Sequence, residues 1–324
     1  MNNFPASKSL TPSIHTAQQT NGPMLHLITH LIQRIWRRPV TLALTFLTVF
    51  LIAPLFLYHL LAYYLANDPR LVPSAFRTAK NILLVTAHPD DETLFFSPSI
   101  LYRNDDATVT RGLLALSSGN YEGIGDIRRS ELQRSCAELG IKRERCVNLD
   151  HYELQDNPQK WWREDLIEEL VGEYVKKWNI DLIITFDDGG ISGHVNHRAV
   201  SAGVSKYISK TPQGPPAYAL QTKFLLRKYA GLADLIPTSM SFSGRILQAI
   251  VSPSREYEVV KVGNGKSSKI QDPYGDKALL VSDWQMYFQA RGAFSQHGSQ
   301  YSFDRVFYLL ISRYMWVNDL RRIV

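Results

Sequence analysis

Short apolar runs alternate with longer helical patterns from residue 81 to about residue 209. The runs are rich in β-branched residues and end abruptly in polar loops, which is typical of buried strands. The segments between them repeat apolar residues every three to four positions, which predicts amphipathic helices. Strands that alternate with helices favour right-handed crossovers, and we therefore expect an α/β fold with a mostly parallel sheet. The predicted strands are 82–86, 107–117, 146–150 and 181–186; a first helix is predicted to start near 91–93, and further helices span 126–140, 158–178 and 196–209.

The chain before this domain has a different character. Residues 39–66 contain no Asp, Glu, Lys or Arg and exceed the roughly 20 residues that cross a bilayer, so we expect one transmembrane helix, kinked at Pro54. Residues 1–23 predict a disordered tail, 24–38 a basic amphipathic segment and 67–80 a linker. Basic residues flank both sides of the apolar segment, so charge alone does not set its orientation.

The pattern is weaker beyond Thr211. We expect a further strand within 217–227, partly helical structure over 229–252 and an insertion or surface loop over 252–280, which is polar and Gly-rich. A last helix begins near Asp283, and the apolar and basic C-terminal segment either packs on the core or touches the membrane surface.

Charge and cysteine content narrow the class of protein. The net charge is +6, but the basic residues are dispersed, which favours a membrane surface or anionic lipid over nucleic acid as partner. Cys136 and Cys146 are the only cysteines, and we expect two free thiols in a reducing compartment.

Two clusters with metal-ligand spacing follow separate strands. His88 and Asp91 lie three residues apart after the first strand, and His194 and His197 have the same spacing after the fourth. Two imidazoles and a carboxylate would bind a divalent cation, best Zn²⁺, and leave positions open for water and substrate. The spacing does not decide which of the later histidines binds the metal. Asp90 is a candidate general base, and the histidine that does not bind metal could act as an acid or stabilise an oxyanion.

Other polar residues have weaker signals. Glu92, Asp187 and Asp188 are either turn and helix-end residues or groups that orient the metal ligands. Arg128 either pairs with Glu131 on one helix face or contacts the sugar or phosphate of a substrate. Two further residues are candidates for substrate contact: Asn120, in the Gly-rich loop after the second strand, and His297.

Five motifs together resemble the eukaryotic branch of the PIG-L/LmbE-like deacetylase family: AHPDDE (87–92), SSGNYEGIGDIRRSEL (117–132), FDDGGISGHVNH (186–197), HGSQ (297–300) and SRYM (312–315). The resemblance covers most of residues 80–320. It implies a Rossmann-like three-layer sandwich over 81–324, with zinc held by His88, Asp91 and His197, Asp90 as general base and His194 as the acid or electrophilic group.

The same resemblance implies the reaction and the location. The family branch removes the acetyl group of N-acetylglucosaminyl-phosphatidylinositol, the second step of glycosylphosphatidylinositol (GPI) anchor synthesis, at the endoplasmic reticulum membrane with the catalytic domain in the cytosol. Neither the segment 252–280 nor the long N-terminal tail has a counterpart in the family pattern.

Three further hypotheses remain open from the sequence. The first is a deacetylase acting on another acetamido sugar. The second is a metal-dependent lipid phosphoesterase, against which the histidine-rich donor set argues because hard cations prefer oxygen. The third is a noncatalytic membrane subunit with the same fold.

Overall fold

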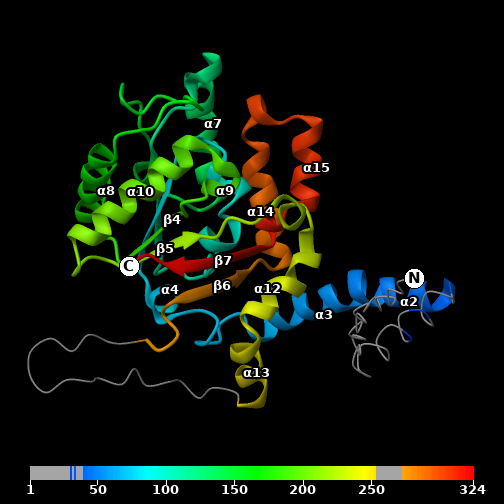
Figure 1. Ribbon diagram of the computed structural model, residues 1–324. Coiled ribbons are helices and arrows are strands. Elements are labelled where there is room, and N and C mark those ends of the chain that lie inside the picture. Colours follow the sequence, from blue (N-terminus) through cyan, green and yellow to red (C-terminus); the bar gives the residue numbers. More distant parts are fainter. Residues whose placement is uncertain (1–29, 31–32, 34–38, 253–271) are drawn as a thin grey trace, which may run out of the picture. The chain divides into compact units, whose positions relative to one another are not determined.

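The structure is a computed structural model that describes residues 30, 33, 39–252 and 272–324 (Figure 1). The expected tail and amphipathic segment (1–38), apart from His30 and Gln33, and residues 253–271 of the expected insertion lie outside the described residues. The chain divides into two compact units, Met1–Val49 and Phe50–Val324. The second unit carries the sheet and all of the candidate site residues.

A seven-stranded mixed sheet forms the centre of the second unit, in the order β3-β2-β1-β4-β5-β7-β6. The first five strands are parallel, and β7 pairs antiparallel with both β5 and β6. This confirms the expected fold class. The strands are β1 (Asn81–Thr86), β2 (Thr110–Ala115), β3 (Cys146–Asn148), β4 (Leu182–Phe186), β5 (Ala217–Leu220), β6 (Lys277–Val281) and β7 (Val317–Arg322).

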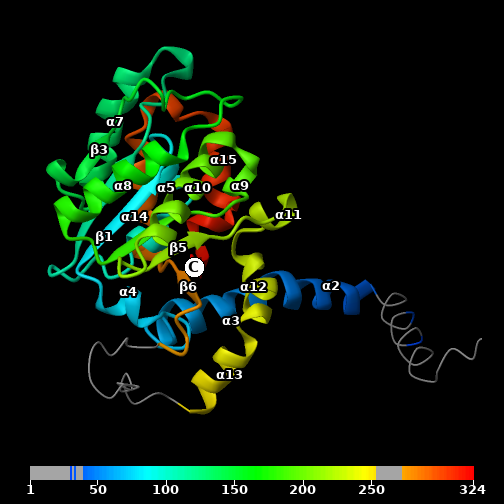
Figure 2. The same ribbon diagram turned by 60° about the vertical axis from the view of Figure 1, so that its left-hand side comes forward.

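Helices cover both faces of the sheet (Figures 1 and 2). Helices α8 and α10 pack against each other on one face, and α7 packs against α14 on the other. In the second unit the main helices are α4 (Ser74–Thr78), α5 (Asp91–Leu94), α6 (Ser97–Ile100), α7 (Gly125–Glu138), α8 (Glu164–Trp178), α9 (Gly190–Gly193), α10 (Val195–Lys210), α11 (Leu225–Lys228), α12 (Leu235–Ser241), α13 (Ser243–Val251), α14 (Trp284–Ser295) and α15 (Phe303–Ile311). Short 3₁₀ turns are η3 (Asn120–Glu122), η4 (Arg143–Arg145), η5 (Gly231–Asp234), η6 (Gly298–Gln300) and η7 (Arg313–Met315).

The strand order places the two chemical clusters side by side. β1 and β4 are parallel neighbours, with Leu84 opposite Ile184, so their carboxyl ends meet at the same edge of the sheet. From β1 the strand order runs outward through β2 and β3 on one side, and from β4 it runs outward through β5 on the other side. Open α/β sheets bind ligands at such a reversal of strand order.

The C-terminal part of the sheet differs from the sequence prediction. Residues 277–280, expected to lie in an insertion or surface loop, belong to strand β6 (Lys277–Val281), and the C-terminal segment contributes both α15 and β7. β6 is short and is buried only at its three central residues, so the sequence shows no clear alternation there. The C-terminal segment packs on the core, which is one of the two alternatives expected from the sequence.

Within the described residues, one helix, Pro39–Tyr64, is long and apolar enough to cross a membrane by its length and composition. It consists of α2 (Pro39–Leu47), the π-helical turn η1 (Thr48–Ile52), α3 (Ala53–His59) and the π-helical turn η2 (Leu60–Tyr64). Pro54 lies in the first turn of α3, directly after η1. Proline removes a backbone hydrogen bond of the helix, and a π turn is one way to accommodate it.

The end of this helix belongs to the core of the second unit. Tyr58, Leu61 and Leu65 are buried, and Tyr58 packs edge-on against Trp284 and Trp316. α3 packs against η5 and α12.

The cysteine prediction is wrong. Cys136 on α7 and Cys146 at the start of β3 form a disulfide, and neither is a free thiol. The two residues lie ten positions apart, separated by the turn that connects α7 to β3, and both side chains are buried against the core.

Candidate metal centre and active site

The loop after β1 turns sharply and brings a carboxylate back to its own backbone. Oδ2 of Asp91 accepts the N–H groups of Ala87 (3.1 Å) and His88 (2.8 Å), which fixes the loop and the carboxylate together. Asp91 is also the first residue of α5, where a negative charge suits the helix N-terminus.

The loop after β4 fixes the second histidine cluster. Oδ1 of Asp187 accepts the N–H groups of Gly189 and Gly190, both at 3.1 Å, and its other oxygen accepts the N–H of Thr222 at 2.6 Å. The main-chain oxygen of Gly190 lies 3.1 Å from Nδ1 of His197. Asp187 therefore shapes the turn that orients His197.

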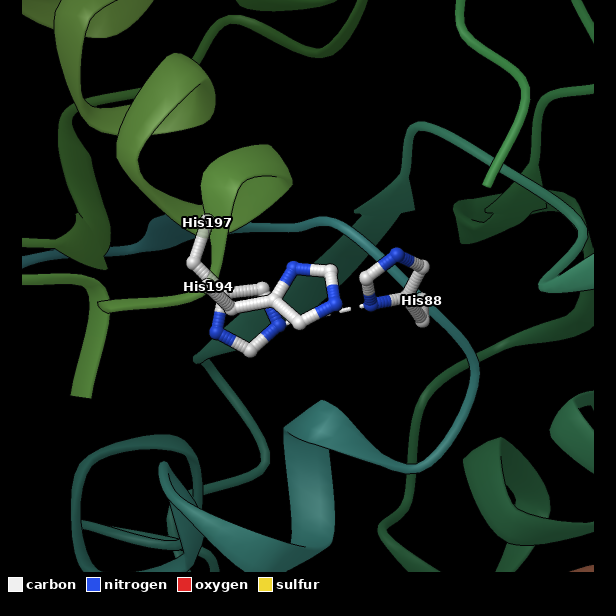
Figure 3. A group of neighbouring side chains, drawn as sticks. All are labelled: His88, His194 and His197. Atoms are coloured by element: carbon white, nitrogen blue, oxygen red, sulfur yellow. Dashed lines mark hydrogen bonds between the residues drawn. The ribbon is translucent and has the colours of Figure 1, made fainter. Parts of the chain in front are cut away.

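Three electron-rich atoms converge between these loops. Nε2 of His197 lies 3.3 Å from Nδ1 of His88 (Figure 3). The same Nε2 lies 3.3 Å from Oδ1 of Asp91, and His88 Nδ1 lies 3.8 Å from the other Asp91 oxygen. Zinc bonds of about 2.0–2.1 Å in tetrahedral geometry separate neighbouring ligand atoms by about 3.3–3.4 Å. The two distances from His197 Nε2, to His88 Nδ1 and to Asp91 Oδ1, therefore match the spacing of neighbouring ligand atoms around a zinc ion.

Each ring has an inner nitrogen that faces the cluster, Nδ1 of His88 and Nε2 of His197, and an outer nitrogen that bonds to other parts of the protein. Nε2 of His88 lies 3.1 Å from Oδ1 of Asp156 and 3.3 Å from Oδ1 of Asn196, and both of these atoms accept hydrogen bonds. The amide of Asn196 is oriented because its nitrogen donates to the main-chain oxygen of Lys160 at 3.1 Å. If these outer nitrogens carry the hydrogens, the inner nitrogens of His88 and His197 have lone pairs that could bind a cation; without a cation, one inner nitrogen carries a hydrogen and bonds the other. Such outer partners are the usual support of metal-bound histidines.

These side chains fit a divalent cation. Two facing imidazole lone pairs and a carboxylate, all buried, repel one another unless a positive charge lies between them. Burial lowers the pKa of His88, but Asp156 and Asp91 outweigh this and raise it. Burial alone would raise the pKa of Asp91, but the charges of His197 and His88 hold this pKa well below its usual range. Both shifts indicate a site that favours added positive charge.

His194 also belongs to the cluster. One donor atom from each of His88, His194 and His197 lies within 4.8 Å of the others, so a three-histidine set competes with the set that includes Asp91 (Figure 3). We favour Asp91 as the third donor because its oxygen is only 3.3 Å from His197 Nε2. Nδ1 of His194 caps α10 by accepting the N–H of Asn196 at 3.3 Å. Burial, together with the neighbouring His197 and His88, lowers the pKa of His194 to about 4, so its ring is neutral at pH 7 with its hydrogen on Nε2.

Asp90 combines a strained backbone with a buried carboxylate. Its φ of 105° lies in the left-handed region, which non-glycine residues rarely adopt. Burial raises the pKa of the carboxyl group, against the opposing charge of Arg128, whose Nη2 lies 3.4 Å from Oδ2. A carboxylate with a raised pKa is a better proton acceptor.

A buried network holds Asp90 in place from behind. Oε2 of Glu92 accepts the N–H of Asp90 at 3.0 Å, and Oε1 accepts Ser135 Oγ and His297 Nε2, both at 2.7 Å. Glu92 and His297 are completely buried. This location does not fit the direct substrate contact expected for His297, and Glu92 supports Asp90 and not one of the expected metal ligands.

Arg128 and Asn120 are both engaged with the protein. Arg128 is buried; it donates to the main-chain oxygens of Pro89 and Gly119 and lies beside Asp90, so its guanidinium ties together the loops after β1 and β2. Gly119 is required there, because a Cβ would lie 2.5 Å from Nη1 of Arg128. Asn120 is exposed, and its side-chain oxygen accepts the N–H of Gly125 at 2.8 Å. Asp188 is exposed as well, and its main-chain oxygen accepts Nε of Arg198.

The chain is similar in sequence to known proteins. A model of the PIG-L family, described as GlcNAc-PI de-N-acetylase, matches residues 83–208. N-acetylglucosaminyl-phosphatidylinositol de-N-acetylase of Bos taurus is 36% identical over 242 residues, which cover 74% of this chain and 81% of that protein. The chain belongs to the PIG-L family.

A further relative and one solved structure are also similar to the chain. A probable N-acetylglucosaminyl-phosphatidylinositol de-N-acetylase of Schizosaccharomyces pombe is 31% identical over 75% of this chain and 87% of its own length. The solved structure of N,N'-diacetylchitobiose deacetylase from Pyrococcus horikoshii matches with a TM-score of 0.50 and 14% identity, over 82% of this chain and 90% of that one. At this identity the structural match shows the shared fold. As a PIG-L family member, the chain is a deacetylase.

Proposed function

We propose that the chain hydrolyses the N-acetyl group of N-acetylglucosaminyl-phosphatidylinositol, giving glucosaminyl-phosphatidylinositol and acetate in GPI-anchor biosynthesis. The relatives that share about three quarters of the chain bear the name of this activity. The observation that carries the proposal is the convergence of His88, Asp91 and His197, within 3.3–3.8 Å of one another, beside the raised-pKa carboxylate of Asp90.

The proposed metal is Zn²⁺, held by His88 Nδ1, Asp91 and His197 Nε2. Nitrogen and carboxylate donors in this number suit zinc better than Mg²⁺ or Ca²⁺, which prefer oxygen. When bound, the cation polarises the acetamide carbonyl and acidifies a water molecule.

The protein's own groups carry the protons. Asp90 accepts a proton from the attacking water as its oxygen bonds to the carbonyl carbon, and the raised pKa of Asp90 favours this transfer. Nε2–H of the neutral His194 ring donates a hydrogen bond to the oxygen on which negative charge develops. The C–N bond then breaks, the amine nitrogen takes up the proton, and acetate leaves.

The substrate is a lipid, and the chain carries a helix that fits a membrane anchor. We propose a single crossing of the endoplasmic reticulum membrane with the catalytic unit in the cytosol. The free thiols expected from the sequence no longer support this orientation, because Cys136 and Cys146 are paired and such bonds are uncommon in reducing compartments. Protease protection in sealed microsomes tests it: digestion of the catalytic unit from outside is expected, and full protection would reverse the orientation.

The reaction is tested with purified protein and N-acetylglucosaminyl-phosphatidylinositol. We expect equal amounts of acetate and free amine, no release of phosphate, loss of turnover on chelation and recovery with one equivalent of Zn²⁺. Phosphate release without acetate would contradict the proposal and favour the phosphoesterase hypothesis.

A further inference from the structure

A cavity of about 340 Å³ lies next to the histidine cluster. Phe95 forms part of its wall, and the ring of Phe95 packs edge-on against His197 at a centroid distance of 5.9 Å. Ser192, two residues before His194, also lines it. The other lining residues come from the end of α11 and from α15: Lys228, Tyr229, Asp304, Arg305, Phe307, Tyr308 and Ile311.

Two cations in this cavity, Lys228 and Arg305, make no ion pair within the described residues. Lys228 is only 9% exposed, and among the described residues its ammonium makes no hydrogen bond or ion pair; it lies 5.9 Å from the ring centroid of Tyr229. Arg305 makes no ion pair in the part of the chain that the structure describes, although its charge acts to lower the pKa of the carboxyl groups of Asp90 and Asp304. The acidic residue of the wall, Asp304, accepts the hydroxyl of Ser302 at 2.6 Å at the start of its own helix. Because a buried, unpaired ammonium is costly, the cavity is suited to an anion.

The elements around the cavity also carry a concentration of exposed apolar side chains. Leu226 at α11 is 78% exposed and Phe303 at the start of α15 is 90% exposed. Leu225, Phe307 and Leu310 on the same two helices are also exposed, as is Phe224 directly before α11. η5, which follows α11, contacts both α15 and α3, so the cavity wall is connected directly to the end of the apolar helix. Grouped exposed apolar residues of this kind mark contact with lipid or protein.

We propose that this cavity binds the phosphodiester of the glycolipid substrate through Lys228 and Arg305, while the apolar side chains of α11 and α15 contact the lipid layer. The inference rests on the proposed function. In such a substrate the phosphodiester lies between the acetylated sugar and the acyl chains. The cavity lies in the corresponding order, between His197 and the exposed apolar residues. Arg128, expected from the sequence to contact phosphate, is already engaged with Pro89, Gly119 and Asp90.

The test compares two water-soluble substrates: a short-chain N-acetylglucosaminyl-phosphatidylinositol, and N-acetylglucosaminyl-inositol, which lacks the phosphodiester. Wild-type protein should prefer the first. Lys228→Met and Arg305→Gln should each lower kcat/KM for the phosphodiester substrate about 10- to 100-fold, mainly through KM, the loss expected for a charge-assisted hydrogen bond. The ratio between the two substrates should then move toward one. Lys210→Met is the matched control, because Lys210 pairs with Glu168 on the surface of α10 and should leave the ratio as in wild type.

Each other outcome has a distinct meaning. An equal loss on both substrates with Lys228→Met would overturn the phosphate site and assign Lys228 a structural role. An effect that appears only when anionic phospholipid vesicles are added would also overturn it, since the ligand would then be a neighbouring lipid. If wild-type protein releases acetate from neither substrate, the proposed function itself fails. Leu225→Ser with Leu226→Ser should lower turnover of vesicle-embedded substrate more than that of the short-chain substrate, and equal loss would remove the lipid contact.

Discussion

Glu92→Gln perturbs the network behind Asp90 with almost no change of shape. The carboxylate accepts three donors: Asp90 N–H, Ser135 Oγ and His297 Nε2. Glutamine has one oxygen and one NH₂ group, so at least one buried donor loses its acceptor, and the bond to His297 loses its charge. An unsatisfied buried donor costs about 1–3 kcal/mol and a charge-assisted bond is worth about twice a neutral one, so we expect a loss of about 2–4 kcal/mol in the free energy of unfolding.

The same change should reduce catalysis. The Asp90 N–H bond to Glu92 helps hold the φ of 105° that places the Asp90 carboxylate. Outer partners of catalytic groups are typically worth 10- to 100-fold, so kcat should fall by about that factor with little change in KM. Glu131→Gln is the matched control. Glu131 lies on α7, and its carboxylate is buried like that of Glu92 but accepts hydrogen bonds from Ser299. We therefore expect stability to fall in this variant while kcat changes far less.

The stability loss should depend on pH. Burial lowers the pKa of His297, but Glu92 outweighs it and the pKa is raised above that of the unfolded chain. A raised histidine pKa stabilises the fold fully below the unfolded value of about 6.5, and this contribution is lost as the pH rises through the folded value. In Glu92→Gln the buried His297 loses the carboxylate that raises its pKa, so the variant lacks this stabilisation. The difference in the free energy of unfolding between wild type and variant should therefore increase as the pH falls. Urea unfolding between about pH 5.5 and 9 measures it. A gap that is constant across this range, with kcat unaltered, would refute the reasoning.

Three further predictions concern the base, the C-terminal ion cluster and the apolar helix. Asp90→Asn should retain metal and lose most turnover because the proton acceptor is gone; wild-type turnover in an acetate-release assay would remove Asp90 from the mechanism. Arg313→Met should cost about 3 kcal/mol in urea unfolding, because fully buried Arg313 bridges Asp234 (2.5 Å) and Asp319 (3.0 Å), although these keep Arg227 and Lys223. Arg129→Met, at a partly exposed pair with Asp150, should cost at most about 1 kcal/mol, and equal losses would show that burial is not decisive. Deleting residues 1–49 should leave a cooperative unfolding transition in detergent, whereas deleting residues 1–66 should abolish it. The longer deletion removes the buried side chains of Tyr58, Leu61 and Leu65, each of which stabilises the fold by about 1.5–3 kcal/mol. Identical unfolding transitions for the two deletions would contradict this prediction.

The parallel half of the fold was predictable because its strands are buried runs with clear ends. Ile82 to Thr86 and Leu182 to Phe186 are apolar or β-branched throughout and stop at charged loops, and the structure has strands there. The antiparallel half was not, because β7 contains charged residues and its register depends on partners far away in the sequence.

The site was predictable where spacing carries the signal. His88, Asp91, His194 and His197 lie at fixed intervals after two strands, and the structure brings them together. Asp156 was missed, although it binds His88, because it lies in an irregular loop and no local pattern connects it to a histidine 68 positions earlier. The placement of Arg128 and His297 behind the site follows from tertiary packing, which residue type alone does not reveal.

The most direct test of the central claim is the metal content of single variants at the cluster. Purified wild-type protein should carry one equivalent of zinc by elemental analysis. His88→Ala, Asp91→Ala and His197→Ala should each lose it, whereas His194→Ala should keep the metal and lose turnover. Stoichiometric zinc in Asp91→Ala together with metal loss in His194→Ala would contradict the donor set of two imidazoles and one carboxylate on which the account depends.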